Sequence, residues 1–338
     1  MNKTLLALGA LLALSSACPS TAHAVFLQSP RATSGFFAPD DNSTHAVAVD
    51  SMGNIFDVRF GAVPLTRRQL INLPGVVGIS AFFDPQDNSR KIIVARNVNG
   101  VGQLDEVYWF ANGAPSHDTL AFFNTMAGSD RTLVSVAGYY SIDGFQHAVA
   151  ATSAGNLYQF RFNHMTGQDY MLHKMTVSFV ANSIKDIAAY QTTFNGDEHV
   201  VVATTTNPTN ALVELYYQGL GAQHLNVLPG SSLVSAMRSI AGGATPSFGS
   251  LAQDTIYQAF NGTTGSGTSV YAWGTGGVAP VTAGPFHRIP LSLGFIYLPN
   301  SGGARAMLYA DESNELVEFV QAEGVSLPWQ QVLSLGTF

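Results

Sequence analysis

The stretch that decides the fold is His147-Ala-Val-Ala-Ala151, followed by Gly155-Asn156 and then by Leu157-Tyr-Gln-Phe-Arg-Phe162. An apolar run opened by a polar residue, a turn pair that tolerates positive φ, and a second run rich in aromatic residues together predict an antiparallel hairpin. Neither run shows the 3.6-residue apolar period of a helix. The stretch is therefore interpreted as two adjacent strands of a sheet.

The same hairpin recurs along the chain. Its opening strands are His45-Ala-Val-Ala-Val49, Lys91-Ile-Ile-Val-Ala95, His147-Ala-Val-Ala-Ala151, His199-Val-Val-Val-Ala203, Asp254-Thr-Ile-Tyr-Gln258 and Arg305-Ala-Met-Leu-Tyr309. The first and the last of these six strands begin 260 residues apart, so the mean repeat is 52 residues. A fixed period of this length is typical of a propeller, a solenoid or another repeat array.

Each repeat has room for two further strands. Runs rich in small residues precede the hairpin, as in Val136-Ala-Gly-Tyr139, and less regular segments such as Gln69–Leu73 follow it. Four short strands per repeat form one blade of a β-propeller, and the small residues suit the crowded strands nearest its axis. We therefore predict an all-β, six-bladed β-propeller of four-stranded antiparallel blades. We expect Val25–Gln28 to close the ring by pairing with the last blade.

The first 24 residues have the features of an export signal. Lys3 supplies a positive start, Leu5–Ala17 is a short apolar run, and Ala22–Ala24 has the small-x-small pattern of a signal-peptidase site. Residues 1–24 are therefore predicted to be a signal peptide, which makes the protein secreted, either periplasmic or extracellular. A lipid anchor on Cys18, in a sequence that resembles the end of a lipoprotein box, is the alternative.

The composition excludes several partners. Lys and Arg number 15 against 22 Asp and Glu, and the net charge of −7 disfavours nucleic acid and anionic membrane surfaces. Beyond the signal, no apolar stretch is long enough to predict a membrane span. Cys18 is the sole cysteine, so residues 25–338, predicted to form a single domain, lack a thiol. We predict no cofactor and no metal.

The predicted third strand carries a polar residue at one recurrent position. That position is occupied by Asp57, Glu106, Gln159, Glu214 and Glu318. Two residues further on come Arg59, Tyr108, Arg161 and Tyr216, and an aromatic residue follows each of them. A carboxylate that accepts hydrogen bonds from hydroxyls, next to a ring that packs against C–H groups, suits a sugar. The alternative is that the acids are buried partners repeated with the blade.

The Glu106-Val-Tyr-Trp109 segment resembles the third strand of six-bladed fucose-binding propeller lectins, and Glu214-Leu-Tyr-Tyr217 is similar. This resemblance implies that a Glu and an aromatic residue surround a sugar in clefts between blades. Those lectins also use an Arg from a neighbouring strand, whereas the second strands of this chain have none in their interior. The predicted ligand-binding residues are Glu106, Trp109, Glu214, Tyr217, Arg59 and Arg161.

These observations favour a secreted binding protein with multivalent carbohydrate recognition, whose partner is a glycan or a small polar ligand. One alternative is a propeller enzyme such as a lactonase, hydrolase or lyase. The isolated Asp186 and His287 are the titratable residues near the predicted inner strands, and no catalytic motif occurs. The other alternative is a scaffold that binds a protein on its loop face. His45, His147 and His199 are interpreted as strand-end residues.

Overall fold

The fold is described from a computed structural model of the chain. The description covers residues 32–61, 63–124, 128–163, 168–169, 173–191, 196–206, 209–217, 224–227, 237–245, 253–262, 265–274, 277–282, 290–299, 304–311, 313, 315–321 and 330–337. The predicted signal peptide, Cys18 and the predicted closing segment Val25–Gln28 lie outside these residues. No helix in the described ranges is long and apolar enough to cross a membrane.

The described residues form strands β1 to β25 and one short 3-10 helix, η1, at Gly128–Arg131. The first two blades contain β1 (Thr33–Ala38), β2 (Ser43–Val49), β3 (Asn54–Gly61), β4 (Thr66–Asn72), β5 (Val76–Asp84), β6 (Ser89–Val98), β7 (Val101–Trp109) and β8 (Ser116–Phe122). The next two contain β9 (Leu133–Tyr140), β10 (Gln146–Thr152), β11 (Asn156–Asn163), β12 (Gln168–Asp169), β13 (His173–Ser178), β14 (Ile184–Gln191), β15 (Glu198–Thr206), β16 (Thr209–Tyr217) and β17 (His224–Val227). The last two contain β18 (Met237–Thr245), β19 (Gln253–Gly262), β20 (Gly265–Gly274), β21 (Gly277–Thr282), β22 (Pro290–Leu298), β23 (Ala304–Asp311), β24 (Glu315–Gln321) and β25 (Gln330–Thr337).

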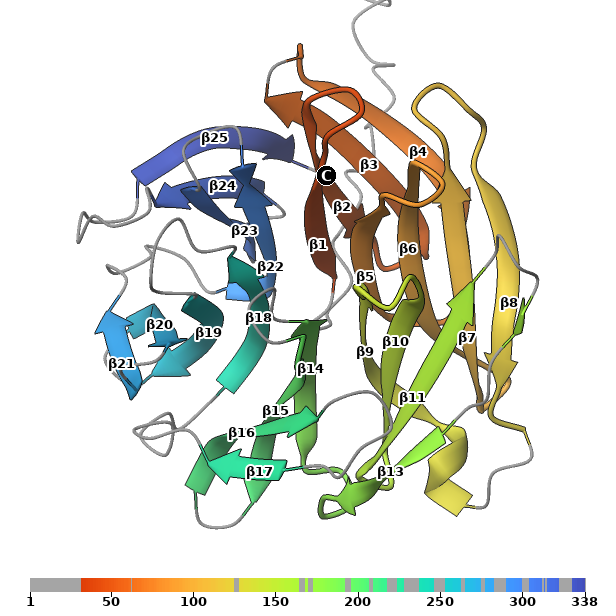
Figure 1. The fold of residues 1–338 in the computed structure, drawn as a ribbon, viewed down its shortest axis with the longest axis vertical. Helices are drawn as coiled ribbons and strands as arrows, with labels where there is room; N and C mark the ends of the chain where they lie inside the picture. Colours follow the sequence, from red (N-terminus) through yellow and green to blue (C-terminus); the bar gives the residue numbers. More distant parts are fainter. Residues whose placement is uncertain are drawn as a thin grey trace, which may run out of the picture.

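These strands form six antiparallel sheets, each built from consecutive strands. Figure 1 shows the sheets arranged around an axis, with β1, β5, β9, β14, β18 and β22 innermost. In the third sheet the outer edge is divided, because β12 and β13 both pair with β11. The predicted six-bladed β-propeller with four-stranded blades is thus confirmed, with this one divided edge as a difference.

The turns follow the chemistry of their residues. Asn42 and Asn88 have φ of 56° and 58° in the turns after β1 and β5, and Gly144 has a φ of 80° in the corresponding turn of the third blade. Gly155 has a φ of 85°, and a Cβ there would lie 2.2 Å from the Phe179 carbonyl oxygen. Asn and Gly reach this conformation more easily than other residues, so the local sequence sets the hairpin register.

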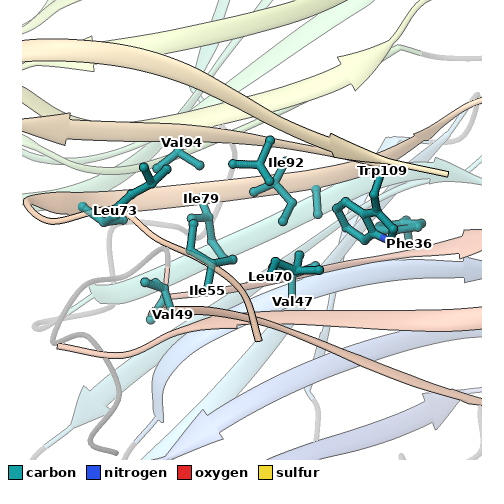
Figure 2. Close-up of a cluster of buried hydrophobic side chains, with 14 of the residues drawn as sticks. Phe36, Val47, Val49, Ile55, Leu70, Leu73, Ile79, Ile92, Val94 and Trp109 are labelled. Atoms are coloured by element: carbon teal, nitrogen blue, oxygen red, sulfur yellow. The ribbon is translucent and has the colours of Figure 1, made fainter. Parts of the chain in front are cut away.

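The hydrophobic core lies between blades rather than within one. In Figure 2, Val47 and Ile55 of the first blade lie near Ile79 and Ile92 of the second, in one buried cluster. Trp109, at the end of β7, is 2% exposed and belongs to the same cluster. Because both faces of a blade are covered, the strands are apolar on both sides and not simply alternating.

A ring of hydroxyl and carboxylate side chains joins the inner strands. At each of the six contacts between neighbouring inner strands, a side-chain oxygen from one strand accepts a hydrogen bond from a backbone N–H of the next. The acceptor–donor pairs are Ser34–Ala81, Ser80–Gly138, Ser135–Ile187, Asp186–Ile240, Ser239–Leu293 and Ser292–Thr33, at 2.8 to 3.4 Å. We call Ser34, Ser80, Ser135, Asp186, Ser239 and Ser292 the inner belt.

The inner belt also closes the ring. Thr33 in β1 donates its backbone N–H and its hydroxyl to the Ser292 hydroxyl in β22, at 3.0 and 2.9 Å. These residues are fully buried, so each bond satisfies a group that would otherwise lose its water. Contacts between β1 and β22 therefore complete the circle within the described residues.

Candidate functional site

One polar arrangement recurs in several blades. It lies at the end of the propeller where turns join the first strand of each blade to the second. The residue that opens the second strand is the cross-strand neighbour of an aromatic residue on the inner strand. The aligned pairs are Phe36–His45, Phe82–Lys91, Tyr139–His147, Tyr190–His199 and Tyr297–Arg305. In the first four blades, the opening residue also contacts the recurrent acid or amide of the third strand. These acids and these histidines are recognisable in the sequence, but the contacts between them are visible only in the structure.

Glu106 and Trp109 are inside the protein. The Glu106 carboxylate is fully buried and lies 3.5 Å from Lys91 Nζ, and the lysine is also 3.5 Å from Asp84 and 3.2 Å from Asp87. Trp109 packs edge-on to Phe36 of the first blade, with 6.3 Å between ring centroids. This geometry matches the alternative interpretation that the recurrent acids are buried partners within the repeat.

Glu214 and Tyr217 are buried in the same way. Glu214 Oε1 lies 2.8 Å from His199 Nδ1, and the imidazole stacks on Tyr190 at 5.4 Å between centroids. Tyr217 is 2% exposed, and burial raises the pKa of its hydroxyl well above the ordinary range, with the Glu198 carboxylate adding to the effect. Four of the six predicted ligand-binding residues are thus at most 4% exposed.

Arg59 is accessible and held in place. Its side chain is 31% exposed, and Nη2 lies 3.0 Å from Asp41 Oδ2. The same Asp41 carboxylate accepts a hydrogen bond from the buried Arg90 of the second blade at 2.8 Å. Burial by itself would raise the Asp41 pKa, but the Ser43 hydroxyl and the two guanidinium groups outweigh it and lower that pKa. Asp41 is therefore ionised at neutral pH and fixes Arg59 on the surface.

Arg161 repeats this arrangement two blades later. Its side chain is 34% exposed, and Nη2 lies 2.9 Å from Asp143 Oδ2. The guanidinium also lies over the ring of Phe145, with 3.8 Å from Cζ to the centroid. Burial would raise the Asp143 pKa, but the hydrogen bond from His147 and the charge of Arg161 lower it. A carboxylate, a cation and a partly exposed ring are thus gathered at one place.

The intervening blades have tyrosine at the equivalent position. Arg59 pairs across the hairpin with His45, Tyr108 with Lys91, Arg161 with His147 and Tyr216 with His199. All four third-strand side chains are partly exposed. We call Arg59, Tyr108, Arg161 and Tyr216 the rim residues. Polar groups and aromatic rings therefore alternate around four successive blades.

One group of described residues has the composition of a metal site. Asp143, His147 and Glu198 place three potential ligand atoms within 4.8 Å of one another. His147 Nε2 lies 3.2 Å from Asp143, while Nδ1 lies 3.2 Å from Glu198 and 3.0 Å from the Gln159 amide. Because the two ring nitrogens point to different partners, the imidazole bridges the third and fourth blades. Burial raises the Glu198 pKa despite the opposing charge of His147.

Two further acidic residues, Asp186 and Asp311, have structural roles. Asp186 belongs to the inner belt, so it is not the isolated residue that its sequence position suggested. In the turn after β23, Asp311 accepts backbone hydrogen bonds from Ser313 at 2.8 Å and Glu315 at 3.1 Å. His287, and most of the loop tips predicted as a partner surface, lie outside the described residues.

Glu318, the recurrent acid of the sixth blade, is 5% exposed, and burial raises its pKa to about 7. The folded state therefore binds this proton more tightly than the unfolded chain, and stability falls as the pH rises from about 4.5 to about 7. We expect Glu318→Gln to raise the free energy of unfolding at pH 8 by about 1–3 kcal/mol. Urea denaturation from pH 4 to 8 tests this. A constant difference between the two proteins at every pH would contradict it.

Six antiparallel blades with a repeated polar set at one end define the protein as a six-bladed β-propeller. It is similar to an arginine-to-alanine triple mutant of AofleA from Arthrobotrys oligospora, with a TM-score of 0.68 at 14% identity, over 92% of this chain and 88% of that one. For the SapL1 lectin in complex with alpha methyl fucoside, the TM-score is 0.66 at 14% identity, over 92% and 97%.

The fucose-specific lectin from Aleuria aurantia, a six-bladed β-propeller, has a TM-score of 0.63 at 13% identity, over 92% of this chain and 97% of that one. No protein-family model matches the sequence, and no curated protein matches it significantly. At these identities the likeness shows a shared fold. The structural resemblance to fucose-binding propeller lectins is thereby confirmed, at the level of the fold.

Proposed function

We propose that the protein is a secreted carbohydrate-binding protein that recognises glycans at several blades. The observation that carries this proposal is the equivalence of Arg59–Asp41 and Arg161–Asp143, two partly exposed ion pairs two blades apart. A guanidinium donates to sugar hydroxyls, and an ionised carboxylate accepts from them. The solved lectins that share the fold support the proposal.

The chemistry of the rim residues suits neutral, hydroxyl-rich ligands. The polar groups are preorganised, because Asp41 and Asp143 fix the guanidinium groups before a ligand arrives. In the third blade the partly exposed Phe145 ring lies beside the Arg161 guanidinium. Tyr108 offers a partly exposed ring and a hydroxyl, whereas Tyr216, whose ring stacks on His199 and His224, offers mainly its hydroxyl. Several weak sites on one rigid ring would give avidity toward a multivalent glycan.

The test is a glycan array with the purified protein, with and without EDTA, followed by the double variant Arg59→Ala/Arg161→Ala. We expect saturable binding to one class of sugar and at least about a tenfold loss of apparent affinity in the variant, because two of the repeated sites lose their donors. Arg131→Ala, which removes an exposed arginine from η1, is the matched control and should bind normally.

A blank array, or a double variant that binds as well as the control, would contradict this site. Loss of binding in EDTA would instead indicate that a metal ion takes part in glycan binding. Asp143, His147 and Glu198 would then be the first metal-coordinating residues to test. Binding of a protein but no glycan would favour the scaffold alternative.

A further inference from the structure

A cavity lies on the axis of the propeller. It is at the end where turns join the first strand of each blade to the second. Its volume is about 560 Å³, within the range of small-molecule sites. Residues from the inner strands of all six blades line it, so the cavity is a property of the assembled ring. It is separate from the rim residues, none of which belongs to its lining.

The walls of the cavity are aromatic. Each inner strand of the first three blades contributes two consecutive rings, and the fourth and sixth contribute others. Phe37, Phe83, Tyr140 and Tyr297 are partly exposed and belong to the lining. Glycine and alanine residues such as Gly242 and Ala189 occupy lining positions between these rings. The surface offered to a ligand is therefore mainly apolar and built from flat rings.

The rings of the cavity wall are held in place by side chains of the second and third strands. Phe36 stacks on His45 at 4.8 Å between centroids with an interplanar angle of 6°, and Tyr190 stacks on His199 at 5.4 Å and 1°. His45 Nδ1 is in turn held 2.8 Å from Asp57 Oδ1. An acid, an imidazole and a ring thus support the cavity wall in the first and fourth blades. A wall fixed in this way loses little side-chain entropy when a ligand binds.

The lining determines the charge of the ligand. Among the described residues that line the cavity there is no Lys, Arg, His, Asp or Glu. An ion that entered would lose its water without gaining a partner of opposite charge. Near the mouth, burial and the charges of Asp84, Asp143 and Asp87 raise the pKa of Tyr140, so the surroundings also disfavour an anion.

We propose that the axial cavity is a second binding site, which takes one uncharged, ring-containing apolar small molecule per chain. This site goes beyond the carbohydrate sites on the rim and does not depend on them. Each flat ring in the wall matches a flat or alicyclic ring in the ligand, and the six blades together provide a single copy of the site.

The probe for the test is N-phenyl-1-naphthylamine, an uncharged dye whose fluorescence increases in apolar surroundings. We expect saturable binding of one dye per chain. The sulfonated relative 1-anilinonaphthalene-8-sulfonate has the same rings with a negative charge, and we expect it to bind at least about tenfold more weakly. Equal binding of the two dyes, or no saturable signal, would overturn the proposal.

Two variants test whether the dye binds in the cavity. Phe37→Asp in the first blade and Tyr297→Asp in the sixth each put a charge on the wall, and each should weaken dye binding at least about tenfold. Phe122→Asp is the matched control, because Phe122 is 55% exposed on the outer strand β8. Circular dichroism identifies any variant that fails to fold. Folded cavity variants that bind the dye like the control would overturn the site, whereas glycan binding should remain unchanged in them.

Discussion

Asp186→Ala is expected to lower the free energy of unfolding by about 3–5 kcal/mol. The Asp186 carboxylate is fully buried in β14 and accepts hydrogen bonds from both neighbouring blades. Ser135 Oγ donates to it from the third blade at 2.8 Å, and the Ile240 N–H donates from the fifth at 2.8 Å. Removing the carboxylate leaves these donors buried without a partner, in two interfaces at once. Urea denaturation followed by circular dichroism measures the effect.

Two further variants show whether the effect arises from the inner belt. Asp186→Asn keeps the shape and one acceptor oxygen, so it should cost less than Asp186→Ala. Asp118→Ala removes an exposed carboxylate from the outer strand β8 and should change the stability by no more than about 0.5 kcal/mol. If Asp186→Ala were as mild as Asp118→Ala, the inner belt would not join the blades as described.

Lys91→Met is expected to destabilise the protein by a similar amount, about 3–5 kcal/mol. Lys91 Nζ is surrounded by three carboxylates, of which Asp84 and Glu106 are 1% and 0% exposed. Methionine fills much of the same volume but leaves both acids buried without a cation. The cost therefore comes from the uncompensated charges and not from a cavity. Chemical denaturation at neutral pH measures it.

A double-mutant cycle with Glu106→Gln isolates this charge effect. Gln is neutral, so the pair Lys91→Met/Glu106→Gln should recover part of the stability lost in Lys91→Met alone. Strictly additive losses would mean that Lys91 and Glu106 do not interact in the folded protein. The same variants test the sequence prediction that Glu106 binds a ligand, because a folded double variant that still binds glycans would place the sugar elsewhere.

The fold could be predicted from the sequence because its information is local. Within each blade the paired strands are close in the chain, as with His147 and Arg161, and Asn or Gly turns fix their register. The 52-residue repeat then gives the number of blades. The polar positions of the third strands and the histidines of the second strands were visible in the same alignment of repeats.

The role of those polar residues was less predictable. The recurrence of Glu106 and Glu214 suggested ligand contacts, whereas the tertiary structure places each next to a buried basic side chain, Lys91 or His199. Arg59 and Arg161 remain accessible because each pairs with a turn aspartate at the edge of its blade. In three blades, an aromatic residue of the inner strand pairs with the histidine that opens the second strand. This recurrent pairing is visible in the repeats and could have predicted the aromatic wall of the cavity.

By itself the sequence determined the strands, the turns, the blade and the number of repeats, because these depend on residues a few positions apart. Only the tertiary structure decided which repeated side chains are buried, because neighbouring blades cover each other's faces. Asp186 meets Ser135 and Ser239 from 51 and 53 residues away, and Thr33 meets Ser292 from 259. The axial cavity likewise exists only when six inner strands surround one axis, because no single repeat encloses a volume.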